Sequence, residues 1–450
     1  MKAYSVMDIC LAVKGALLQG DADMMVSAVT TDSRKIEEGA LFIPLVGERF
    51  DGHDYIEMAL QSGAAGCFTT KLPFNTVEGK FYILVEDTLL ALKALASWYR
   101  GEFPIPMVQI TGSAGKTTTK EMVASVLSQK FSTLKTEANF NNAIGTPQTL
   151  LRLDDTHEAA VIETGMNHFD EIRYLGDMVR PDVAIITNVG DAHVENLGGT
   201  RLGVLQAKSE IFDNLNPDGL AILNGDDALL RELRPNFRTV LCGKGENCHV
   251  RVSDIAERGI EGMDCTITTE KATYAVHIPS PGAFMIYPAS MAVAVGEHLG
   301  LTAEEIVRGI AAYTSVGSRM RVVRKDSRII IDDCYNANPQ AMAQALETLA
   351  KTDVPRRMAV LGDMGELGAL TEQAHREIGA LTAKLGIDTV VAVGEKSRAI
   401  LAGNGDALWF ATLEEALPTI VEQFTDGTAV LVKASHAMNF PKIVKELEEV

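Results

Sequence analysis

The sequence has little of what zinc-binding, disulfide-rich or membrane-spanning proteins need. Its six cysteines are scattered over 450 residues, and none belongs to a Cys-x-x-Cys pair or joins a histidine cluster. This pattern argues against a zinc site and is typical of a reducing compartment. The N-terminus carries no apolar signal segment, and the longest weakly polar run, residues 282–295, is shorter than the roughly 20 residues that span a membrane. We therefore expect a cytoplasmic protein without membrane insertion, in which residues 282–295 form a buried helix.

Positive charge is also scarce. The chain has 41 Lys and Arg against 60 Asp and Glu, a formal net charge of -19 at pH 7. This balance argues against a nucleic acid or an anionic membrane as a general partner, although acidity also has the simpler effect of keeping a protein soluble. An anionic substrate would have to be held by local Lys and Arg side chains and by backbone N–H groups.

The length of the chain and its proline positions predict three domains. A chain of 450 residues is too long for one core, and a hydrophobic content of 46% is ordinary for a folded protein. Pro104 and Pro106 disfavour continuing a helix or a central strand, so they mark one boundary. A second boundary is expected before Gly317. The predicted domains are 1–102, 103–316 and 317–450.

Apolar runs of strand length alternate with helical stretches along most of the chain. Continuous apolar strands predict parallel sheets that helices cover on both faces. The expected fold is therefore α/β throughout, with a central parallel-sheet domain, a Rossmann-like C-terminal domain and a smaller N-terminal domain. Helices are expected at 56–62 and 89–100. The predicted strands are 108–111, 159–163, 183–188 and 220–224 in the second domain and 328–332, 358–361, 390–393 and 429–432 in the third.

The most informative stretch is Thr111–Lys120, which lies between a strand-like run and a helical run. Strand, glycine-rich turn and helix bind nucleotide phosphates, because glycines let the backbone approach and the helix N-terminus offers free N–H groups. In such a site Lys116 reaches the β- and γ-phosphates and the Thr117 hydroxyl ligates Mg²⁺. Ile110 stands where the usual pattern has glycine, so we expect a variant loop; an ordinary turn is the alternative. The phosphate-binding residues are then Gly112, Ser113, Ala114, Gly115, Lys116, Thr117 and Thr118.

Polar residues follow two further predicted strands. Glu163 ends one of them, and His193 lies on the loop after the other. Since parallel strands present their carboxyl ends at one edge of a sheet, we expect both near the phosphate loop. A carboxylate and an imidazole there suit Mg²⁺, whereas a helix cap and a structural loop histidine are the alternatives. Loop 139–145, with Asn142, should offer amides to the same region. No Asn-Lys-x-Asp follows a strand, which disfavours a GTPase.

Two other groups of polar residues have weaker signals. In the first domain, Ser33, Arg34, Gly47 and His53 suit either a pocket for a phosphorylated ligand or a set of turn and capping residues. In the third, the stretches 333–339, 361–367 and 432–436 follow strands and so belong on the ligand edge. Lys208 lies in a helical stretch, where spacing alone predicts an ordinary solvated lysine.

Together these stretches resemble the Mur ligases, the ATP-dependent enzymes that add amino acids to the peptidoglycan precursor. The resemblance runs over all three domains. Tyr335-Asn336-Ala337-Asn338-Pro339 and Leu361-Gly362-Asp363-Met364 are selective for the branch that adds D-alanyl-D-alanine. The other carriers are Asp32-Ser33-Arg34, the loop from Gly47 to His53, the variant phosphate loop, Asn141-Asn142 with Ile144-Gly145, and Thr187-Asn188 with His193.

The resemblance implies a role for each matching residue. Thr117 and Glu163 match the ligands of one Mg²⁺, and His193 and Lys208 those of a second, Lys208 as a carbamate; Lys116, Glu163, His193 and Lys208 would carry the catalysis. This reverses the interpretation of Lys208 as a solvated lysine. The residues implied to bind the UDP-linked substrate are Ser33, Arg34, Gly47, Asp51, Gly52, His53 and Lys433. Those implied to bind ATP, besides the phosphate loop, are Asn142, Arg319, Asp333, Asn336 and Asn338.

The implied activity is ATP-driven amide-bond formation through an acyl phosphate, joining D-alanyl-D-alanine to a UDP-N-acetylmuramoyl-tripeptide. The implied cofactors are ATP and two Mg²⁺ ions, and a monomer is expected. Two alternatives stay open: another ligase of the superfamily, including the folylpolyglutamate type, which segment 31–53 argues against, and a catalytically weak protein that binds the precursor.

The sequence departs from the family pattern at two places. Phe284, Met285 and Pro288 stand where the family carries a His-Asn or His-Met pair and then an Asn that help place the nucleotide base. The family's Lys-Gly-Ser-Arg is here Lys433-Ala434-Ser435-His436. Because His436 stands where the family has arginine, the role of that arginine is not carried over. The changes at Phe284 and Pro288 are the reason for keeping the binding-protein alternative.

Overall fold

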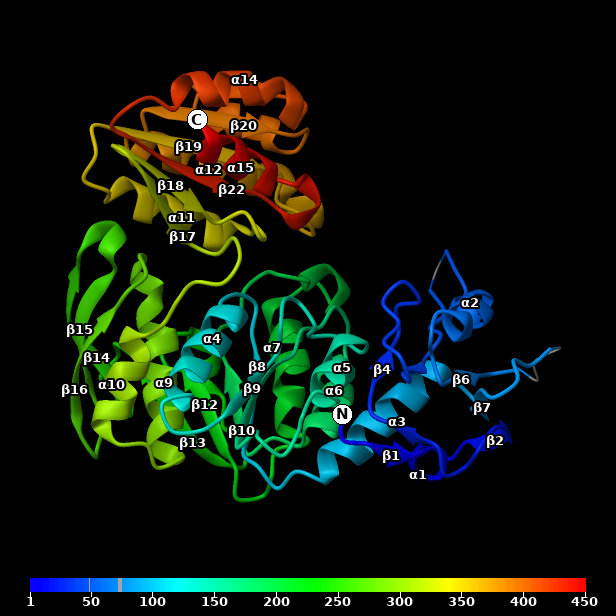
Figure 1. The fold of residues 1–450 in the computed structure, drawn as a ribbon. Helices are drawn as coiled ribbons and strands as arrows, with labels where there is room; N and C mark the ends of the chain where they lie inside the picture. The colour runs from blue at the N-terminus through cyan, green and yellow to red at the C-terminus, as the bar shows by residue number, and fades with distance from the viewer. Residues whose placement is uncertain (48, 72–74) are drawn as a thin grey trace.

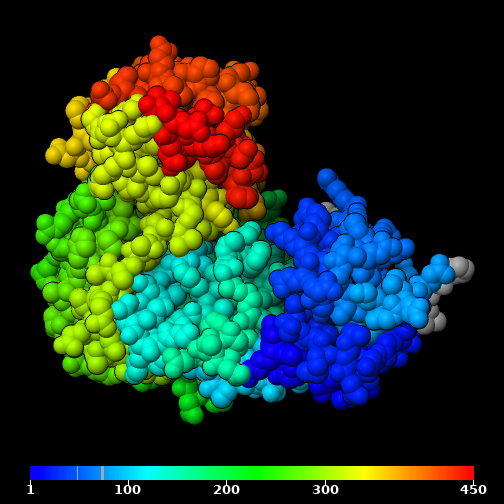
Figure 2. Space-filling model, viewed as in Figure 1, coloured from blue at the N-terminus to red at the C-terminus, as the bar shows by residue number. Residues whose placement is uncertain are grey.

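The computed structural model describes residues 1–47, 49–71 and 75–450, which fold into three lobes in chain order (Figure 1). The N-terminal lobe lies beside the central one, and the C-terminal lobe covers one end of the central lobe (Figure 2). The predicted three-domain α/β fold is confirmed. The boundaries at 102 and 316 stay predictions.

The N-terminal lobe is built on a five-stranded sheet of order β2-β7-β6-β5-β4, parallel except for β2. Helix α3 begins after Asp87, whose side chain accepts a hydrogen bond from Leu90 N (2.8 Å). The predicted helices 56–62 and 89–100 are present as α2 and α3. The bounds are β1 Tyr4–Ser5, α1 Val6–Val13, β2 Ala16–Gln19, β3 Met25–Val26, β4 Val29–Thr30, β5 Leu41–Phe42, α2 Ile56–Gln61, β6 Gly66–Thr69, β7 Phe81–Leu84 and α3 Thr88–Gly101.

The central lobe contains a nine-stranded sheet of order β16-β15-β14-β13-β12-β11-β8-β10-β9. Strands β8 to β14 run parallel. The buried apolar runs of β8, β10, β11 and β12 explain why the sequence predicts those four, whereas β9, β13 and β14 are not among the predicted strands. Beyond β14 the sheet continues as two antiparallel strands that the sequence analysis did not predict. The strands are β8 Met107–Thr111, β9 Thr133–Lys135, β10 Ala159–Glu163, β11 Val183–Ile186, β12 Leu220–Asn224, β13 Arg238–Gly243, β14 Val250–Glu257, β15 Met263–Thr268 and β16 Thr273–Ile278.

Helices cover both faces of the central sheet. Helix α9 is packed against α4 and is apolar on all sides, with residues 288–296 buried, so the predicted buried helix within 282–295 is confirmed. The helices are α4 Lys116–Leu127, α5 Gly145–Leu150, α6 Glu171–Val179, α7 Arg201–Ser209, α8 Ala228–Glu232, α9 Ile286–His298 and α10 Ala303–Ala311.

The C-terminal lobe is a six-stranded sheet of order β17-β18-β22-β19-β20-β21, parallel except for β17. Separate apolar clusters fill the two faces, under α11 and α12 on one side and α14 and α15 on the other. The elements are β17 Arg321–Lys325, β18 Arg328–Asp332, α11 Pro339–Ala350, β19 Arg356–Gly362, α12 Thr371–Lys384, β20 Thr389–Val393, α13 Ile400–Gly403, β21 Leu408–Phe410, α14 Leu413–Gln423, β22 Thr428–Lys433 and α15 Pro441–Glu449. Over the described ranges of the chain, every helix is too short or too polar to cross a membrane.

Candidate active site

A cavity of about 570 Å³ lies between the central and C-terminal lobes. The phosphate loop and the ends of β10, β11 and β12 line it from the central lobe, and the start of α11 lines it from the C-terminal lobe. Most residues predicted to bind ATP or metal are therefore brought together at one place. The predicted residues lining it are Ser113, Ala114, Gly115, Lys116, Thr117, Thr118, Asn142, Glu163, His193, Arg319, Asp333, Asn336, Asn338 and Lys433.

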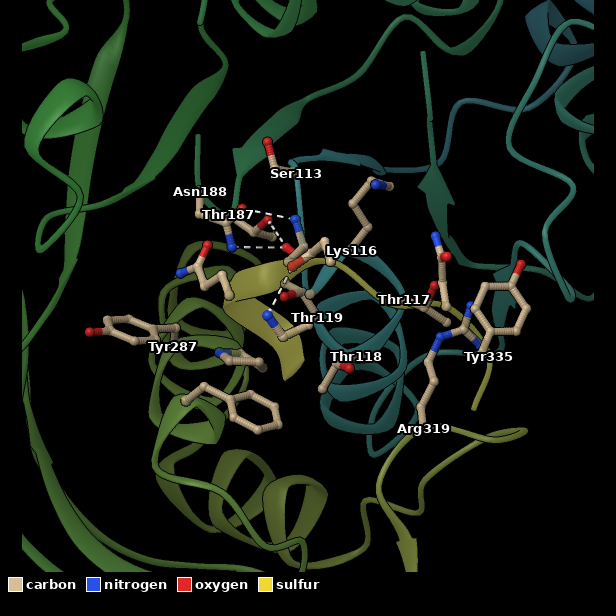
Figure 3. Close-up of a pocket in the computed structure, with 18 of the residues that line it drawn as sticks. Ser113, Lys116, Thr117, Thr118, Thr119, Thr187, Asn188, Tyr287, Arg319 and Tyr335 are labelled. Carbon is tan, nitrogen blue, oxygen red and sulfur yellow. Dashed lines mark hydrogen bonds between the residues drawn. The ribbon is translucent and has the colours of Figure 1, made fainter. Parts of the chain in front are cut away.

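The phosphate loop is held in shape by the end of β11 (Figure 3). Asn188 Oδ1 accepts a hydrogen bond from Ala114 N (2.8 Å), and Thr187 Oγ1 donates one to Ala114 O (2.6 Å). Helix α4 begins directly after Gly115, whose φ of 77° lies in the left-handed region that favours glycine. Lys116 Nζ donates to Gly112 O (2.8 Å), so the lysine folds over the loop. The variant loop thus ends in free helical N–H groups and one ammonium group, a site for an anion.

Gly112 lies so close to β11 that a side chain has no room. A Cβ built there meets Thr187 Oγ1 at 1.8 Å. We expect Gly112→Ala to cost about 1–3 kcal/mol of stability, as overpacking does, and to weaken ADP binding because the loop must move. Adding Thr187→Ala should restore only part of the loss, because Thr187 Cβ remains at 3.0 Å, the φ of 155° at Gly112 strains any residue with a side chain, and the hydrogen bond to Ala114 O is lost. Thermal unfolding and ADP calorimetry of the single and double variants test this; an unrescued double variant would contradict it.

Glu163 is the last residue of β10, is only 2% exposed, and does not cap a helix. Its Oε2 accepts a hydrogen bond from Thr117 Oγ1 (2.7 Å), and its Oε1 accepts one from Asn141 Nδ2 (2.8 Å). Among the described residues, neither Lys nor Arg forms an ion pair with this buried carboxylate. A buried carboxylate beside a hydroxyl, with neutral partners only, is a set of oxygen donors that suits Mg²⁺. The alternative of a helix cap is therefore wrong for Glu163.

Cationic side chains gather next to this carboxylate. Burial lowers the pKa of Lys116, and the charge of Arg319 lowers it further, while Glu163 partly opposes them. Burial and the charge of Lys116 bring the pKa of Lys208 well below its ordinary value. Burial is also the main cause of the lowered pKa of His193. Because several like charges meet in a poorly solvated place, the site favours an anionic ligand.

Lys208 is on α7, lies 2% exposed and does not line the cavity itself. The prediction from spacing, an ordinary solvated helix lysine, is therefore wrong: α7 packs against α6 and α8, and Lys208 is buried. Within the described part of the chain it forms no ion pair. A buried lysine without a carboxylate partner is unusual and calls for a chemical explanation.

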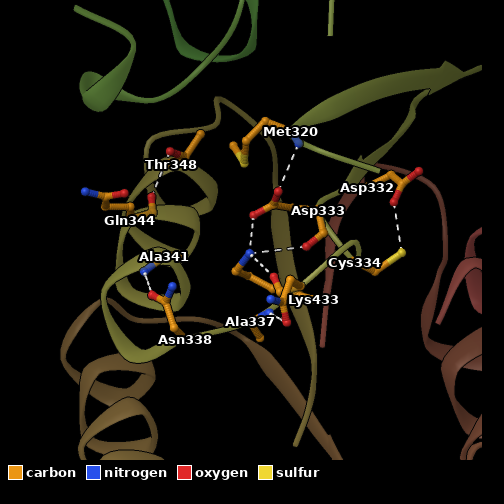
Figure 4. Close-up of polar contacts among 11 residues, drawn as sticks. Met320, Asp332, Asp333, Cys334, Ala337, Asn338, Ala341, Gln344, Thr348 and Lys433 are labelled. Carbon is orange, nitrogen blue, oxygen red and sulfur yellow. Dashed lines mark hydrogen bonds and ion pairs between the residues drawn. The ribbon is translucent and has the colours of Figure 1, made fainter. Parts of the chain in front are cut away.

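The C-terminal wall of the cavity is organised by the pair Asp333 and Lys433 (Figure 4). Lys433 Nζ donates to Asp333 Oδ2 (2.5 Å), to Asp333 O (3.2 Å) and to Asn336 O (3.1 Å). All three ammonium donors are thus engaged in holding the turn after β18. Asn338 caps α11 by accepting a hydrogen bond from Ala341 N (2.9 Å). Burial raises the pKa of Asp333, and the charge of Lys433 opposes this.

Tyr335 and Arg319 form a contact that the residue-by-residue prediction missed. The Arg319 guanidinium lies 3.5 Å from the centre of the Tyr335 ring, near Thr117 (Figure 3). On the other side, the Tyr335 ring lies 5.4 Å from that of His436. A cation over an aromatic face is held in place without losing its charge. Arg319 is thereby kept on the cavity side of the turn after β18.

At the opposite end of the cavity lie Phe284, Met285 and Pro288, the positions that the resemblance matches to the nucleotide base. Tyr287 and Asp226 line the same end and were missed. Tyr287 Oη donates to Asp226 Oδ2 (3.1 Å), a carboxylate that also accepts the backbone N–H groups of Lys244 and Gly245. The rule that ligands bind at the carboxyl ends of parallel strands points to Asp226, which follows β12. Applied to β12, this rule would have identified Asp226 as a cavity residue.

The predicted residues of the N-terminal lobe lie outside this cavity. Arg34 is exposed and forms a two-point hydrogen bond with Asp32 (2.8 and 2.9 Å). Asp51 caps the turn that begins at Gly52, and its Oδ1 lies 2.6 Å from His53 Nδ1. Capping therefore accounts for Asp51, as the alternative interpretation holds. Ligand binding by Ser33, Arg34, Gly47, Asp51, Gly52 and His53 stays a prediction, and Glu48 lies outside the described residues.

Comparisons with known proteins cover nearly the whole chain. Family models match at residues 25–97 (Mur ligase family, catalytic domain), 110–296 (Mur ligase middle domain) and 318–436 (Mur ligase, glutamate ligase domain). The UDP-N-acetylmuramoyl-tripeptide--D-alanyl-D-alanine ligase of Bacillus subtilis is 36% identical over 99% of this chain and 98% of its own length. The Escherichia coli ligase of the same name is 38% identical over 96% of each.

Solved structures agree with these relatives. MurF from Acinetobacter baumannii superposes with a TM-score of 0.93 at 32% identity and full coverage of both chains. MurF ligase from Thermotoga maritima in complex with ADP has a TM-score of 0.84 at 29% identity, covering 94% of this chain and 97% of that one. A folylpolyglutamate synthase of Mycobacterium tuberculosis, at 18% identity and a TM-score of 0.64, shares the fold.

Proposed function

The chain belongs to the Mur ligase family, and we propose that it is the ATP-dependent ligase that joins D-alanyl-D-alanine to UDP-N-acetylmuramoyl-tripeptide. The observation that supports this proposal is that the chain is 36% and 38% identical, over nearly its whole length, to two ligases of that name. A phosphate loop that faces a buried carboxylate across one cavity agrees with an ATP-driven reaction. The reaction belongs to peptidoglycan synthesis, and hence to cell-wall biogenesis.

The proposed chemistry has two steps. The terminal carboxylate of the tripeptide attacks the γ-phosphorus of ATP, forming an acyl phosphate as the bond to ADP breaks. The amine of D-alanyl-D-alanine then attacks the acyl carbon, an amide forms, and inorganic phosphate leaves with the amine proton lost to solvent. A carboxylate is a poor electrophile, so the acyl phosphate supplies the leaving group.

The chain's own groups serve this chemistry mainly by position and charge. Lys116 moves from Gly112 O to the β/γ-phosphate oxygens, and the N–H groups at the start of α4 hold the phosphate chain. Arg319, fixed on the Tyr335 ring, approaches the same oxygens from the C-terminal lobe. Asp333, Asn336 and Asn338 shape the wall on that side, and Asn142 lines the cavity from loop 139–145.

Two Mg²⁺ sites fit the residues present. Thr117 and Glu163 would hold the first, and His193 with Lys208 the second. Bound Mg²⁺ supplies neutralisation of the negative charge on the phosphate oxygens. Burial lowers the pKa of Lys208, so this amine would add CO₂ more readily than an ordinary lysine and, with loss of a proton, form a carbamate. This anion replaces an unpaired amine beside Lys116 and His193, and so relieves the crowding of cations described above.

The nucleotide base is placed at the far end of the cavity from Lys116. With the phosphates at the loop, the base reaches Phe284, Met285, Tyr287 and Pro288. Aromatic and apolar side chains suit a base, whose faces stack on rings. The ring of Phe284 packs against the apolar clusters of both lobes, so it is held firmly without the family's usual residues at these positions.

The N-terminal lobe is assigned to the UDP-linked substrate. The exposed guanidinium of Arg34 is available to an anionic pyrophosphate, and Ser33, Gly47, Asp51, Gly52 and His53 lie in the neighbouring turns. The domains follow as 1–102 for this substrate, 103–316 for ATP and 317–450 for closure over the nucleotide. Lys433 holds the closing domain's turn. We place the protein in the cytoplasm, as a monomer.

A phosphate-release assay tests the proposal directly. We expect release from ATP only when UDP-N-acetylmuramoyl-tripeptide and D-alanyl-D-alanine are both present with Mg²⁺, because the acyl phosphate forms on one substrate and is consumed by the other. Mass spectrometry should show the pentapeptide product. Release with neither substrate would mean another NTPase; stimulation by folate and glutamate would mean a folylpolyglutamate ligase; no release at all would mean a binding protein.

A further inference from the structure

Among the described residues, three ion pairs join the central and C-terminal lobes: Arg324–Glu261, Lys351–Glu257 and His193–Glu366. The last of these lies at the edge of the cavity, which His193 lines. His193, on the loop after β11, has its Nδ1 2.9 Å from Oε2 of Glu366. Glu366 belongs to the C-terminal lobe, on the loop between β19 and α12. Next to it, a Cβ at Gly368 would lie 3.4 Å from Glu195 Oε2 of the central lobe, so the two loops run side by side. The pair therefore forms only while the C-terminal lobe covers this end of the central lobe.

Both partners have an uncommon backbone. His193 has a φ of 62° and Glu366 a φ of 59°, the left-handed conformation that side-chain-bearing residues rarely adopt. Such conformations persist where the surroundings determine them, and they cluster at functional sites. Each loop is thus shaped to direct this one side chain toward the other lobe.

The loop that carries Glu366 is anchored at three successive residues. Asp363 Oδ1 accepts a hydrogen bond from Ser397 N (2.8 Å). Met364 N donates to Nε2 of the buried His375 (2.9 Å), and Gly365 N donates to Ser435 Oγ (2.8 Å). The Glu366 side chain is 67% exposed, but the backbone that carries it is held in place by the C-terminal lobe.

The pair holds the imidazole by one edge. A carboxylate oxygen 2.9 Å from Nδ1 favours a proton on that nitrogen, which leaves Nε2 as the atom available to a metal. His193 lines the cavity near Lys116 and Lys208, which face it from the central lobe. Carboxylate, imidazole and metal in line is the common arrangement by which an outer carboxylate strengthens a histidine ligand.

We propose that Glu366 is a positioning residue that orients His193 toward its Mg²⁺ and so makes the second metal site complete only when the C-terminal lobe is closed. This rests on the proposed function, which assigns His193 to that metal. Glu366 itself does not line the cavity. The inference adds a link between the lobes: nucleotide and metal bind more tightly to the closed arrangement, and their binding favours closure by the same factor.

The test measures metal binding, with Mn²⁺ as a paramagnetic substitute for Mg²⁺, by electron paramagnetic resonance of the full chain with ADP. Glu366→Ala should raise the Kd of the weaker Mn²⁺ site about 10-fold, the loss typical of an outer-shell partner. Glu366→Asp should recover part of it. Glu195→Ala is the matched control, because Glu195 lies beside the Glu366 loop, near Gly368, and does not pair with His193. The Mn²⁺ affinity of this variant should equal that of the wild type.

A double-mutant cycle with His193→Ala decides whether Glu366 acts through the histidine. If it does, Glu366→Ala has no further effect on Mn²⁺ binding in the His193→Ala background. Additive losses, an unchanged Kd in Glu366→Ala, or an equal loss in Glu195→Ala would each overturn the inference. The wild-type phosphate-release assay separates the two proposals: a wild type that forms product while Glu366→Ala binds Mn²⁺ normally refutes this inference alone, and a wild type that forms no product refutes the function.

Discussion

Lys116→Ala is expected to abolish ligase turnover while the protein stays folded. The ammonium lies at the start of α4 with the phosphate loop around it, and its hydrogen bond is to Gly112 O (2.8 Å). In the variant, no cation from the phosphate loop neutralises the negative charge that develops on the β/γ-phosphate oxygens. Loss of one such electrostatic group typically lowers kcat by about 10²–10³. Phosphate release with both co-substrates gives the rate, and thermal unfolding reports the fold.

The fold should survive because Lys116 contributes little to it. Burial lowers the pKa of this lysine, which means that the folded state stabilises its charged form less than water does. Lys130→Ala is the matched control: Lys130 Nζ also donates to a glycine carbonyl, Gly300 O, at 2.8 Å, but on the exposed surface away from the cavity. It should leave turnover unchanged. If Lys116→Ala kept most of the activity, the assignment of the phosphate loop would be wrong.

The parts of this fold that could be predicted from the sequence are those whose physics is local. Strands β10, β12 and β18 match the predicted ranges 159–163, 220–224 and 328–332 residue for residue, because strands buried on both faces are continuous apolar runs between turns. The phosphate loop is local in the same sense: strand, glycines, lysine and helix follow one another within a few residues.

Structure that depends on distant partners was harder to predict. Strands β15 and β16 alternate buried and less buried residues and pair antiparallel at the edge of the central sheet, a pattern weaker than a continuous apolar run. The strand-end rule puts Glu366, within the stretch 361–367, on the ligand edge, but nothing in the sequence indicates its pairing with His193, which is far away in sequence and on another lobe. The pattern of apolar residues also does not predict the contact between the Arg319 guanidinium and the Tyr335 ring, because that contact depends on the conformation of the turn after β18.

Lys208 shows most clearly what a sequence pattern cannot predict. Its helical spacing predicts solvent exposure, yet α7 packs so that the residue is only 2% exposed. Only the resemblance to a family indicated a buried, modified lysine. Lys120 is buried to a similar degree, at 1% exposed, but its Nζ already has an ion pair with Glu121 (2.9 Å) and a hydrogen bond to Thr136 O (2.6 Å). Burial alone therefore does not distinguish Lys208 from Lys120; the lack of an anionic partner among the described residues does.

The carbamate gives Lys208 a large expected effect. Lys208→Met keeps an unbranched apolar side chain in the buried position and removes the nitrogen, so the fold should persist. Without the carbamate the second metal loses an anionic ligand, and we expect turnover to fall by roughly 10²–10³, as for other groups that neutralise charge at this step. Wild-type protein equilibrated with ¹³C-bicarbonate should show one carbamate resonance by ¹³C NMR, and this resonance should be missing from Lys208→Met.

The comparison with Lys130→Ala makes the NMR result specific. That variant lacks an exposed lysine and should keep both the resonance and the turnover, so a signal from surface amines is excluded. The burial that depresses the pKa of Lys208 also favours this lysine over others, because a lower pKa raises the share of the uncharged amine, the form that reacts with CO₂. A wild type with no labelled carbamate, or a Lys208→Met variant that keeps most of its turnover, would show that the buried amine serves the site unmodified or not at all.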